Sequence, residues 1–224
     1  MHPGPTAMPR RPRRILKPIC FHVTNRRAGR TAIFQTPADY RAFLEILHQG
    51  LQRHPVRLIA YCLMPNHWHL VVGPVYSDDL SRLMHWVTVT HAVRWHHHRN
   101  SVGLGPVYQN RYWSEPLDDP DRLILVCRYV ERNALKAHLV SRAEDWPWCS
   151  LADRLRPSPS LPVVSSAFLT SRAWTEYVNA PSFHEEAPWR VFHKSRPVPL
   201  TVENVPVRGP GRQARRPRRS RAGG

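Results

Sequence analysis

Hydrophobic and polar positions along the middle of the chain form two kinds of pattern. Three short runs rich in β-branched and aromatic residues, each ended by polar or proline-containing segments, predict β-strands. Elsewhere, apolar residues recur three or four positions apart, which is the spacing of an amphipathic helix. The predicted strands are residues 19–24, 56–63 and 68–72, and Met64-Pro65-Asn66-His67 suits a tight turn between the last two.

Helix-start signals separate these strands. Thr36 is a suitable cap, Pro37 suits a first helical turn, and Asp39 complements the helix dipole, so a helix is predicted from Thr36 onward. A second helix is predicted from Ser77. After a fourth strand over residues 107–117, Asp119-Pro120-Asp121 repeats the cap-plus-proline signal and predicts a third helix through about Leu135. A further helix is predicted over residues 167–178.

The order strand, helix, strand, strand, helix, strand, helix defines the fold class. It is the order of the ferredoxin-like split βαβ arrangement, an α+β fold with an antiparallel sheet and helices packed on one face. The other face of the sheet would then be available for functional side chains. We expect a basic arm at 1–17, the main domain at 18–150, a helical extension at 151–180 and a disordered Pro/Arg-rich tail at 181–224.

Charge indicates the kind of partner. The chain has 33 Lys and Arg against 16 Asp and Glu, a formal charge of +17. Residues 1–17 hold five basic residues and residues 208–224 hold seven arginines, with no acid in either segment. The ends are therefore flexible basic arms around a mildly basic body, and nucleic acid is the default partner, although solvated tails that serve solubility would carry the same charge.

Two other classes of protein are not favoured. No run of about 18 apolar residues is present, and the start of the chain lacks the apolar segment of a secretory signal, so we expect a cytoplasmic protein with no membrane partner. Four scattered cysteines lie among apolar neighbours without Cys-x-x-Cys spacing. We interpret them as reduced core residues.

Candidate chemistry comes from two pairs of residues. His67 and His69 lie two apart at the start of a strand, so they point to one face while Trp68 points to the other, and two imidazoles can bind one divalent ion. Tyr129 and Asn133 lie four apart on the third helix and share a face. If this face meets the histidine strand, the Asn133 amide oxygen completes a metal site beside Tyr129.

A tyrosine near a divalent ion suggests phosphoryl transfer to a phenol, because the ion polarises a phosphate that the tyrosine oxygen attacks. Free tyrosine has a pKa of about 10, so it needs an acceptor for its proton and a nearby positive charge. On spacing alone, an ordinary helix in which Tyr129 packs and Asn133 is merely polar is the simpler interpretation.

Five blocks of sequence resemble, in order and with compatible spacing, the REP-associated tyrosine transposases, a single-tyrosine branch of the HUH (His-hydrophobe-His) transposases. The resemblance spans roughly residues 18–178 and leaves out both arms. The blocks are His22-Val23-Thr24-Asn25-Arg26, Met64-Pro65-Asn66-His67-Trp68-His69, Tyr108-Gln109-Asn110-Arg111-Tyr112, Tyr129-Val130-Glu131-Arg132-Asn133 and Glu144-Asp145-Trp146-Pro147-Trp148-Cys149-Ser150.

The resemblance implies a metal-dependent endonuclease and strand transferase, associated with the bacterial nucleoid, that acts on single-stranded DNA hairpins of repeat elements. It implies that His67, His69 and Asn133 bind the ion and that Tyr129 forms a 5′-phosphotyrosine link. We expect Mg or Mn as the ion. The family's usual Asn-Pro-Val-Arg-Ala-Gly is here Asn133-Ala134-Leu135-Lys136-Ala137-His138, which predicts a longer helix with an altered end.

DNA contacts are expected from Arg26, Arg111 and Trp113, although a core tryptophan and ordinary surface arginines would fit the sequence as well. A protein that binds nucleic-acid hairpins without cutting them is the alternative function, and a zinc hydrolase would need further ligands that the spacing does not offer. The resemblance is compatible with a monomer or a homodimer.

Overall fold

The structure is a computed structural model that describes residues 19–181. Both predicted basic arms lie outside the described residues, apart from Pro181. Within the described part of the chain, no helix combines the length and apolarity needed to cross a bilayer.

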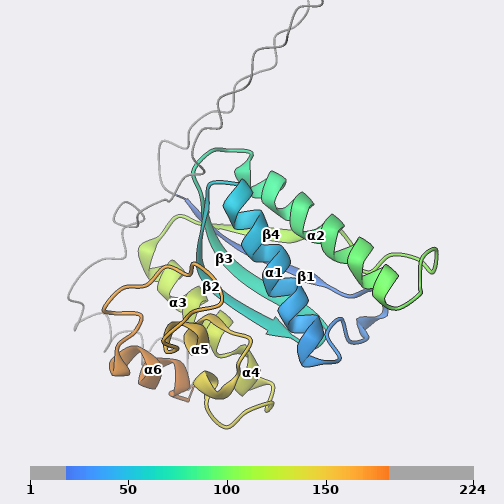
Figure 1. Cartoon of the computed structure of the whole chain (residues 1–224). Helices are drawn as coiled ribbons and strands as arrows, with labels where there is room; N and C mark the ends of the chain where they lie inside the picture. The colour runs from blue at the N-terminus through green and yellow to red at the C-terminus, as the bar shows by residue number, and fades with distance from the viewer. Residues whose placement is uncertain (1–18, 182–224) are drawn as a thin grey trace, which may run out of the picture.

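The sheet has four antiparallel strands in the order β2-β3-β1-β4, so β2 and β4 are its edges (Figure 1). The order of elements through α3 is the one predicted, and the ferredoxin-like fold class is confirmed. The strands are β1 (Cys20–Arg26), β2 (Val56–Met64), β3 (His67–Pro74) and β4 (Trp113–Leu117). The helices are α1 (Pro37–Arg53), α2 (Asp79–His98), α3 (Pro120–Glu131), α4 (Asn133–Lys136), α5 (Ser150–Arg154) and α6 (Arg172–Asn179), with short 3-10 turns at Ala28–Arg30 and Ala143–Asp145.

Local sequence explains where the main helices begin. The Thr36 side chain accepts from the backbone N–H of Asp39, and the Asp39 carboxylate accepts in return from the backbone N–H of Thr36, which is a capping box. Asp119 caps α3 in a similar way by accepting from the N–H of Asp121, and Pro120 occupies the first turn. Both caps are as predicted.

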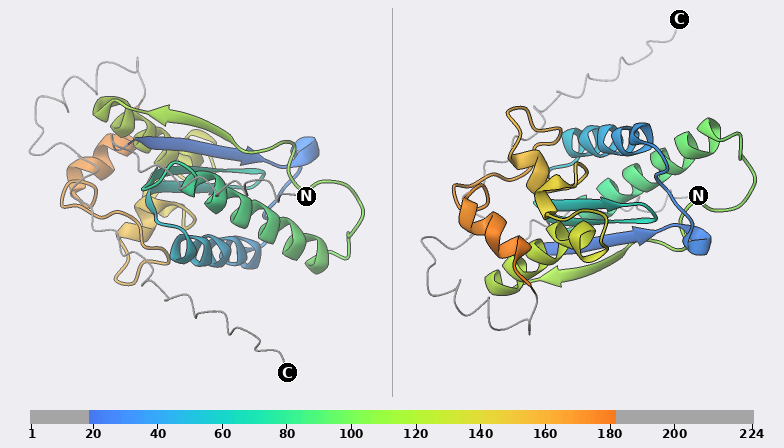
Figure 2. Two further views of the ribbon diagram at one scale, coloured as in Figure 1. Left: turned by 90° about the horizontal axis from the view of Figure 1, so that it is seen from above. Right: turned by 90° about the horizontal axis from the view of Figure 1, so that it is seen from below.

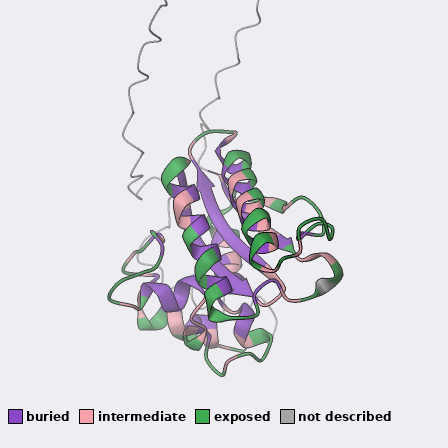
Figure 3. Ribbon diagram, turned by 45° about the vertical axis from the view of Figure 1, so that its right-hand side comes forward, coloured by how far each residue is buried: buried purple, intermediate pink, exposed green. Residues whose placement is uncertain are grey.

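Helices cover both faces of the sheet, and the expectation that they pack on one face is wrong. One core lies between the sheet and α1 and α2, and it contains Phe43, Trp68 and Leu83. A second core lies on the opposite face beneath α3, α5 and α6, and it contains Cys62 and Trp174. Both views of Figure 2 show the sheet between α1 and α3, and Figure 3 shows buried strands beside helices whose outer sides are exposed.

Helices pack on both faces because the segment after β4 has apolar residues of its own, which are buried against the second face of the sheet. Strand β2 is buried on both faces, because the alternate residues Ala60, Cys62 and Met64 pack under the helices that follow β4. All four cysteines are buried and free, as predicted.

Strand β4 is shorter than predicted. It begins at Trp113, and the segment before it makes only an isolated bridge between Arg27 and Tyr108. Tyr108 is drawn into the core, where its hydroxyl meets His91 Nδ1 at 2.7 Å and accepts from Trp68 Nε1 at 3.3 Å. This burial pulls the backbone out of the strand path, so the ladder starts only afterwards.

The third helix also ends earlier than predicted. It stops at Glu131, and a separate turn, α4, follows. His138 then takes a positive φ of 55°. The N–H of His138 donates to Leu135 O and that of Leu139 to Ala134 O, the Schellman arrangement in which glycine is usual. The helix end thus keeps a left-handed residue although the sequence lacks glycine there.

The last helix is shorter than the predicted 167–178. Ser171 caps α6 by accepting from the N–H of Trp174, so the residues before it form turns. Helix α6 packs Trp174 and Val178 into the second core, on the face of the sheet that also carries the histidines.

Candidate functional site

The two predicted histidines lie at the start of β3, on the face of the sheet that α3 covers. His67 pairs with Met64 and Arg26 on the neighbouring strands, and His69 pairs with Cys62 and Thr24. Their ring centroids are 5.0 Å apart. Trp68, between them, points into the opposite core and is fully buried. The alternation of faces is therefore as predicted.

A third histidine, His22 on β1, completes this cluster. Its Nε2 lies 2.9 Å from His69 Nδ1, and the two rings stack with centroids 5.1 Å apart. The sequence marks His22 only as part of a resembling block, because its proximity to His69 depends on β1 lying next to β3. One signal in the sequence pointed to His22. It lies two and four residues before Thr24 and Arg26, so it shares their side of β1, and these two residues pair directly with His69 and His67.

Each of the two neighbouring histidines has a partner at Nδ1. The amide oxygen of Asn66 is 2.6 Å from His67 Nδ1 and acts as the acceptor, so that nitrogen carries the proton and Nε2 carries the lone pair. In His69, Nδ1 faces His22, while the buried Nε2 has no hydrogen-bond partner among residues 19–181. His67 therefore leaves Nε2 available to a ligand, and His69 does the same in the tautomer whose Nδ1–H donates to His22 Nε2.

Burial keeps these imidazoles neutral. It lowers the pKa of His22 to about 4, and burial together with the nearby Arg26 charge lowers the pKa of His67 to about 4. The pKa of His69 is held well below its usual range by burial first and then by His67, His22 and Arg26. Neutral imidazole is the form that binds metal ions.

Tyr129 lies over the histidines from α3. Its ring centroid is 5.6 Å from that of His69 and 6.0 Å from that of His22, both edge-on, and its side chain is 43% exposed. The Lys136 ammonium lies 5.7 Å from the centre of the Tyr129 ring. The phenol is thus close to the cluster, open to an incoming molecule and beside a positive charge.

Asn133 begins α4, one turn after Tyr129, and it is buried. Its Nδ2 donates to the carbonyl oxygen of Tyr129 at 3.3 Å. This bond ties the amide to the turn that carries the tyrosine and leaves Oδ1 to accept or ligate. Although the helix breaks at Arg132, Tyr129 and Asn133 stay one turn apart and in contact, as their spacing in the sequence predicted.

A buried polar network fixes the end of α3 under this site. The Glu131 side chain is completely buried, and its Oε1 accepts from Ser150 Oγ at 2.6 Å and from Arg154 Nη1. Its Oε2 accepts from Trp174 Nε1 at 2.8 Å. Arg154 Nη2 also donates to Ile59 O on β2 at 2.6 Å. Glu131 therefore joins α3 to the sheet, α5 and α6.

Two arginines attach α3 to the end of α6. Arg128 Nε donates to Tyr177 O at 2.8 Å, and Arg128 Nη2 donates to Ala180 O at 2.7 Å. Arg132 Nη1 donates to Val178 O at 2.7 Å. These bonds satisfy carbonyls at a helix C-terminus, where positive charge is favourable, and they tie α6 to the helix that carries Tyr129.

The three residues predicted to contact DNA do not lie together. Arg26 is exposed at the end of β1, opposite His67. Trp113 is 52% exposed, and its ring lies edge-on to His22 with centroids 5.7 Å apart, so it is not a core residue. Arg111 instead lines a separate cavity beside α2.

The chemistry of the donors fits a divalent ion. No group of three or more His, Cys, Asp or Glu side chains within residues 19–181 is arranged to hold a metal. Two neutral histidines with available Nε2 atoms, one of them a buried nitrogen without a partner, fit such an ion when an amide oxygen is the third donor.

Known proteins resemble part of this chain. The family model described as "Transposase IS200 like" matches residues 16–133. A Haemophilus influenzae protein that carries the name REP-associated tyrosine transposase is 24% identical over 121 residues, which cover 50% of this chain and 69% of that protein.

Two solved structures are also similar. The structure of a REP-associated tyrosine transposase bound to a REP hairpin has a TM-score of 0.52 and 18% identity, and the match covers 72% of this chain and 92% of that chain. A Deinococcus radiodurans protein described as a transposase has a TM-score of 0.40 and 16% identity, with 55% and 95% of the two chains covered. The first of these likenesses shows the fold.

Proposed function

The chain belongs to the family of IS200-like transposases, and from this premise we propose that it cleaves and rejoins single-stranded DNA through Tyr129. We propose a divalent ion, Mg or Mn, held by His67, His69 and Asn133, and hairpin-bearing repeat DNA as the substrate. The observation that carries the proposal is the position of the Tyr129 ring, 5.6 Å from the ring of His69, whose buried Nε2 lacks a partner.

In the proposed cleavage step, the Tyr129 oxygen attacks a backbone phosphorus of the DNA strand. A P–O bond forms to tyrosine as the P–O3′ bond breaks, which leaves a 5′-phosphotyrosine and a free 3′ end. The phenol loses its proton and the departing O3′ gains one. When bound, the ion would supply positive charge that polarises the phosphate and stabilises charge developing on its oxygens.

The chain's own residues orient and stabilise the reacting groups. His22 and Asn66 fix the ring orientations of His69 and His67 through their Nδ1 atoms. Lys136 provides a positive charge beside the Tyr129 ring. In the rejoining step, a 3′-hydroxyl of DNA attacks the phosphotyrosine, a new P–O3′ bond forms and Tyr129 is released. Each step replaces one phosphate ester by another, so no ATP is needed.

The test is formation of a covalent adduct between the full chain and labelled single-stranded hairpin DNA, resolved on a denaturing gel with Mn²⁺ or with EDTA. The wild-type protein should form the adduct only with the ion, and Tyr129→Phe should form none while still binding the hairpin. Tyr76→Phe is a matched control, because Tyr76 is a tyrosine of similar exposure, 40% against 43%.

Two results would contradict the proposal. An adduct that persists in Tyr129→Phe would assign the nucleophile to another residue. Tight hairpin binding without cleavage under every divalent ion would instead favour the alternative of a hairpin-binding protein.

A further inference from the structure

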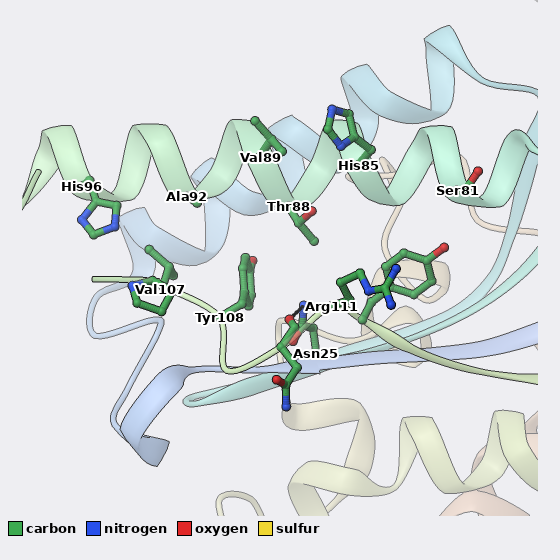
Figure 4. Close-up of a pocket in the computed structure, with 13 residues that line it drawn as sticks. Asn25, Ser81, His85, Thr88, Val89, Ala92, His96, Val107, Tyr108 and Arg111 are labelled. Atoms are coloured by element: carbon green, nitrogen blue, oxygen red, sulfur yellow. Dashed lines mark hydrogen bonds between the residues drawn. The ribbon is translucent and has the colours of Figure 1, made fainter. Parts of the chain in front are cut away.

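The face of the sheet opposite the histidines carries a candidate ligand site. A cavity of about 560 Å³ opens between α2 and the segment that leads into β4 (Figure 4). Its volume is within the range of roughly 300–1,000 Å³ that is usual for small-ligand sites. None of the thirteen lining residues is acidic, while His85, His96 and Arg111 are basic. An anionic or neutral ligand is therefore favoured over a cation.

The walls of the cavity are fixed before any ligand arrives. Asn25 Oδ1 accepts from the N–H of Arg26 at 2.8 Å, and Asn25 Nδ2 donates to Asn110 O at 3.3 Å, which holds the loop before β4 against β1. Tyr108 is bonded into the core through its hydroxyl. A preformed cavity loses little conformational entropy when it binds a ligand.

The side chains that face the opening combine three kinds of contact. Tyr112 offers a partly buried aromatic ring, and Val89 offers an apolar surface that is 47% exposed. Arg111 is exposed and has no ion-pair partner within residues 19–181. Aromatic stacking for a base and a cation for its phosphate are what proteins use to bind unpaired nucleotides.

A residue that lines the cavity is next in sequence to a residue that contacts the histidine cluster. Tyr112 lines the cavity, while the next residue, Trp113, packs against His22 on the opposite face. Strand β4 is an edge strand, so its outer side is not paired within the sheet. A DNA strand leaving the histidine cluster could therefore cross the edge at β4 and enter the cavity.

We propose that this cavity binds one unpaired nucleotide of the DNA strand, with the base against Tyr112 and Val89 and the phosphate near Arg111. The proposal rests on the proposed function, because that function supplies single-stranded DNA as the ligand. It adds a subsite on the face of the sheet opposite Tyr129, so that the substrate is held at two points on either side of β4.

The test compares Val89→Asp with Val93→Asp in the full chain. Both valines are on α2 and about half exposed, 47% and 52%, but only Val89 lines the cavity. The two variants change the net charge of the protein equally. Affinity is measured at one fixed salt concentration for a hairpin with a single-stranded flank and for the same hairpin without the flank.

Val89→Asp should weaken binding of the flanked hairpin about tenfold, because a carboxylate replaces the apolar contact with the base, and should leave binding of the bare hairpin unchanged. Val93→Asp should alter neither. A 2-aminopurine base scanned along the flank should be quenched at one position in the wild type and in Val93→Asp, and at none in Val89→Asp.

Equal affinities for the two variants, or quenching that survives in Val89→Asp, would overturn the proposal. If Val89→Asp does not fold, Tyr112→Leu replaces it, with the same expected loss. Covalent adduct formation, measured at saturating DNA, tests the proposed function of Tyr129 separately from the subsite, which is tested by affinity. A wild type that forms no adduct refutes the proposed function alone, whereas a Val89→Asp variant with normal affinity and normal adduct refutes the subsite alone.

Discussion

Two buried polar clusters lie beside α3, and they differ in whether their polar atoms have partners. Glu131 is completely buried, and its two oxygens accept from Ser150, Arg154 and Trp174. His69 is 6% exposed, yet its Nε2 has no partner among the described residues. Leaving a buried polar atom unpaired costs about 1–3 kcal/mol. The first cluster therefore stabilises the fold, and the second retains a cost that a ligand would remove.

Three polar residues of one sequence block differ in their burial and in their hydrogen-bond partners. Tyr129, Glu131 and Asn133 are all within five positions, and all are polar. Tyr129 is partly exposed above the histidines, Asn133 lies one turn away, and Glu131 is enclosed by protein. Burial and hydrogen bonding distinguish the surroundings of these three residues, which the block alone does not.

The largest effect is expected at Glu131. Glu131→Gln keeps the shape of the side chain but leaves the buried Arg154 charge without its counterion, so the free energy of unfolding should fall by about 3–5 kcal/mol, measured by urea denaturation. Glu176→Gln is the control, because Glu176 forms an exposed ion pair with Arg172 and should change stability by less than about 1 kcal/mol. Equal effects of the two substitutions would contradict the structural role.

A smaller effect is expected when the pH is lowered in the absence of metal. Burial lowers the pKa of His22 from 6.5 to about 4. Between these values the unfolded chain binds a proton that the folded chain does not, so the contribution of His22 to stability is complete above pH 6.5 and is lost as the pH falls toward 4. At pH 5 the loss should be about 2 kcal/mol for this residue.

The measurement is the free energy of unfolding of wild type and His22→Phe between pH 7 and pH 4.5. The wild-type curve should be steeper by up to about 1.4 kcal/mol per pH unit, the slope of one proton. Parallel curves would show that His22 is not buried as a neutral group.

The smallest effect concerns metal binding. His22→Phe removes the partner of His69 Nδ1, so the affinity for Mn²⁺ should fall roughly tenfold, the lower range for loss of such a supporting contact. Titration calorimetry measures the affinity, and ¹⁵N NMR of the imidazoles reports the tautomer of His69, which a purely structural role would not alter. His22→Gln, which keeps an acceptor, should restore part of the affinity.

His97→Phe is the control, since His97 is an exposed histidine on α2. An Mn²⁺ affinity in His22→Phe equal to that of this control would contradict the supporting role of His22.

Local patterns were sufficient for much of the fold and for part of the candidate site. The caps at Thr36 and Asp119, the turn between β2 and β3, and the shared face of His67 and His69 follow from interactions within a few residues of each other. So does the spacing of Tyr129 and Asn133. A strand has a period of two and a helix a period of 3.6, so side-chain direction along one element can be predicted from the sequence.

Other features were decided only by the tertiary structure, because they join residues far apart in the chain. His22 and His69 are 47 positions apart, and they meet because β1 lies between β3 and β4. The start of β4 depends on the burial of Tyr108 against Trp68 and His91. The packing of helices on both faces depends on the apolar residues after β4, which join β2 in the second core. The sequence determines which way a side chain points from its own backbone. Which partner it reaches is set by strand order and by the packing of two cores, and these are properties of the whole chain.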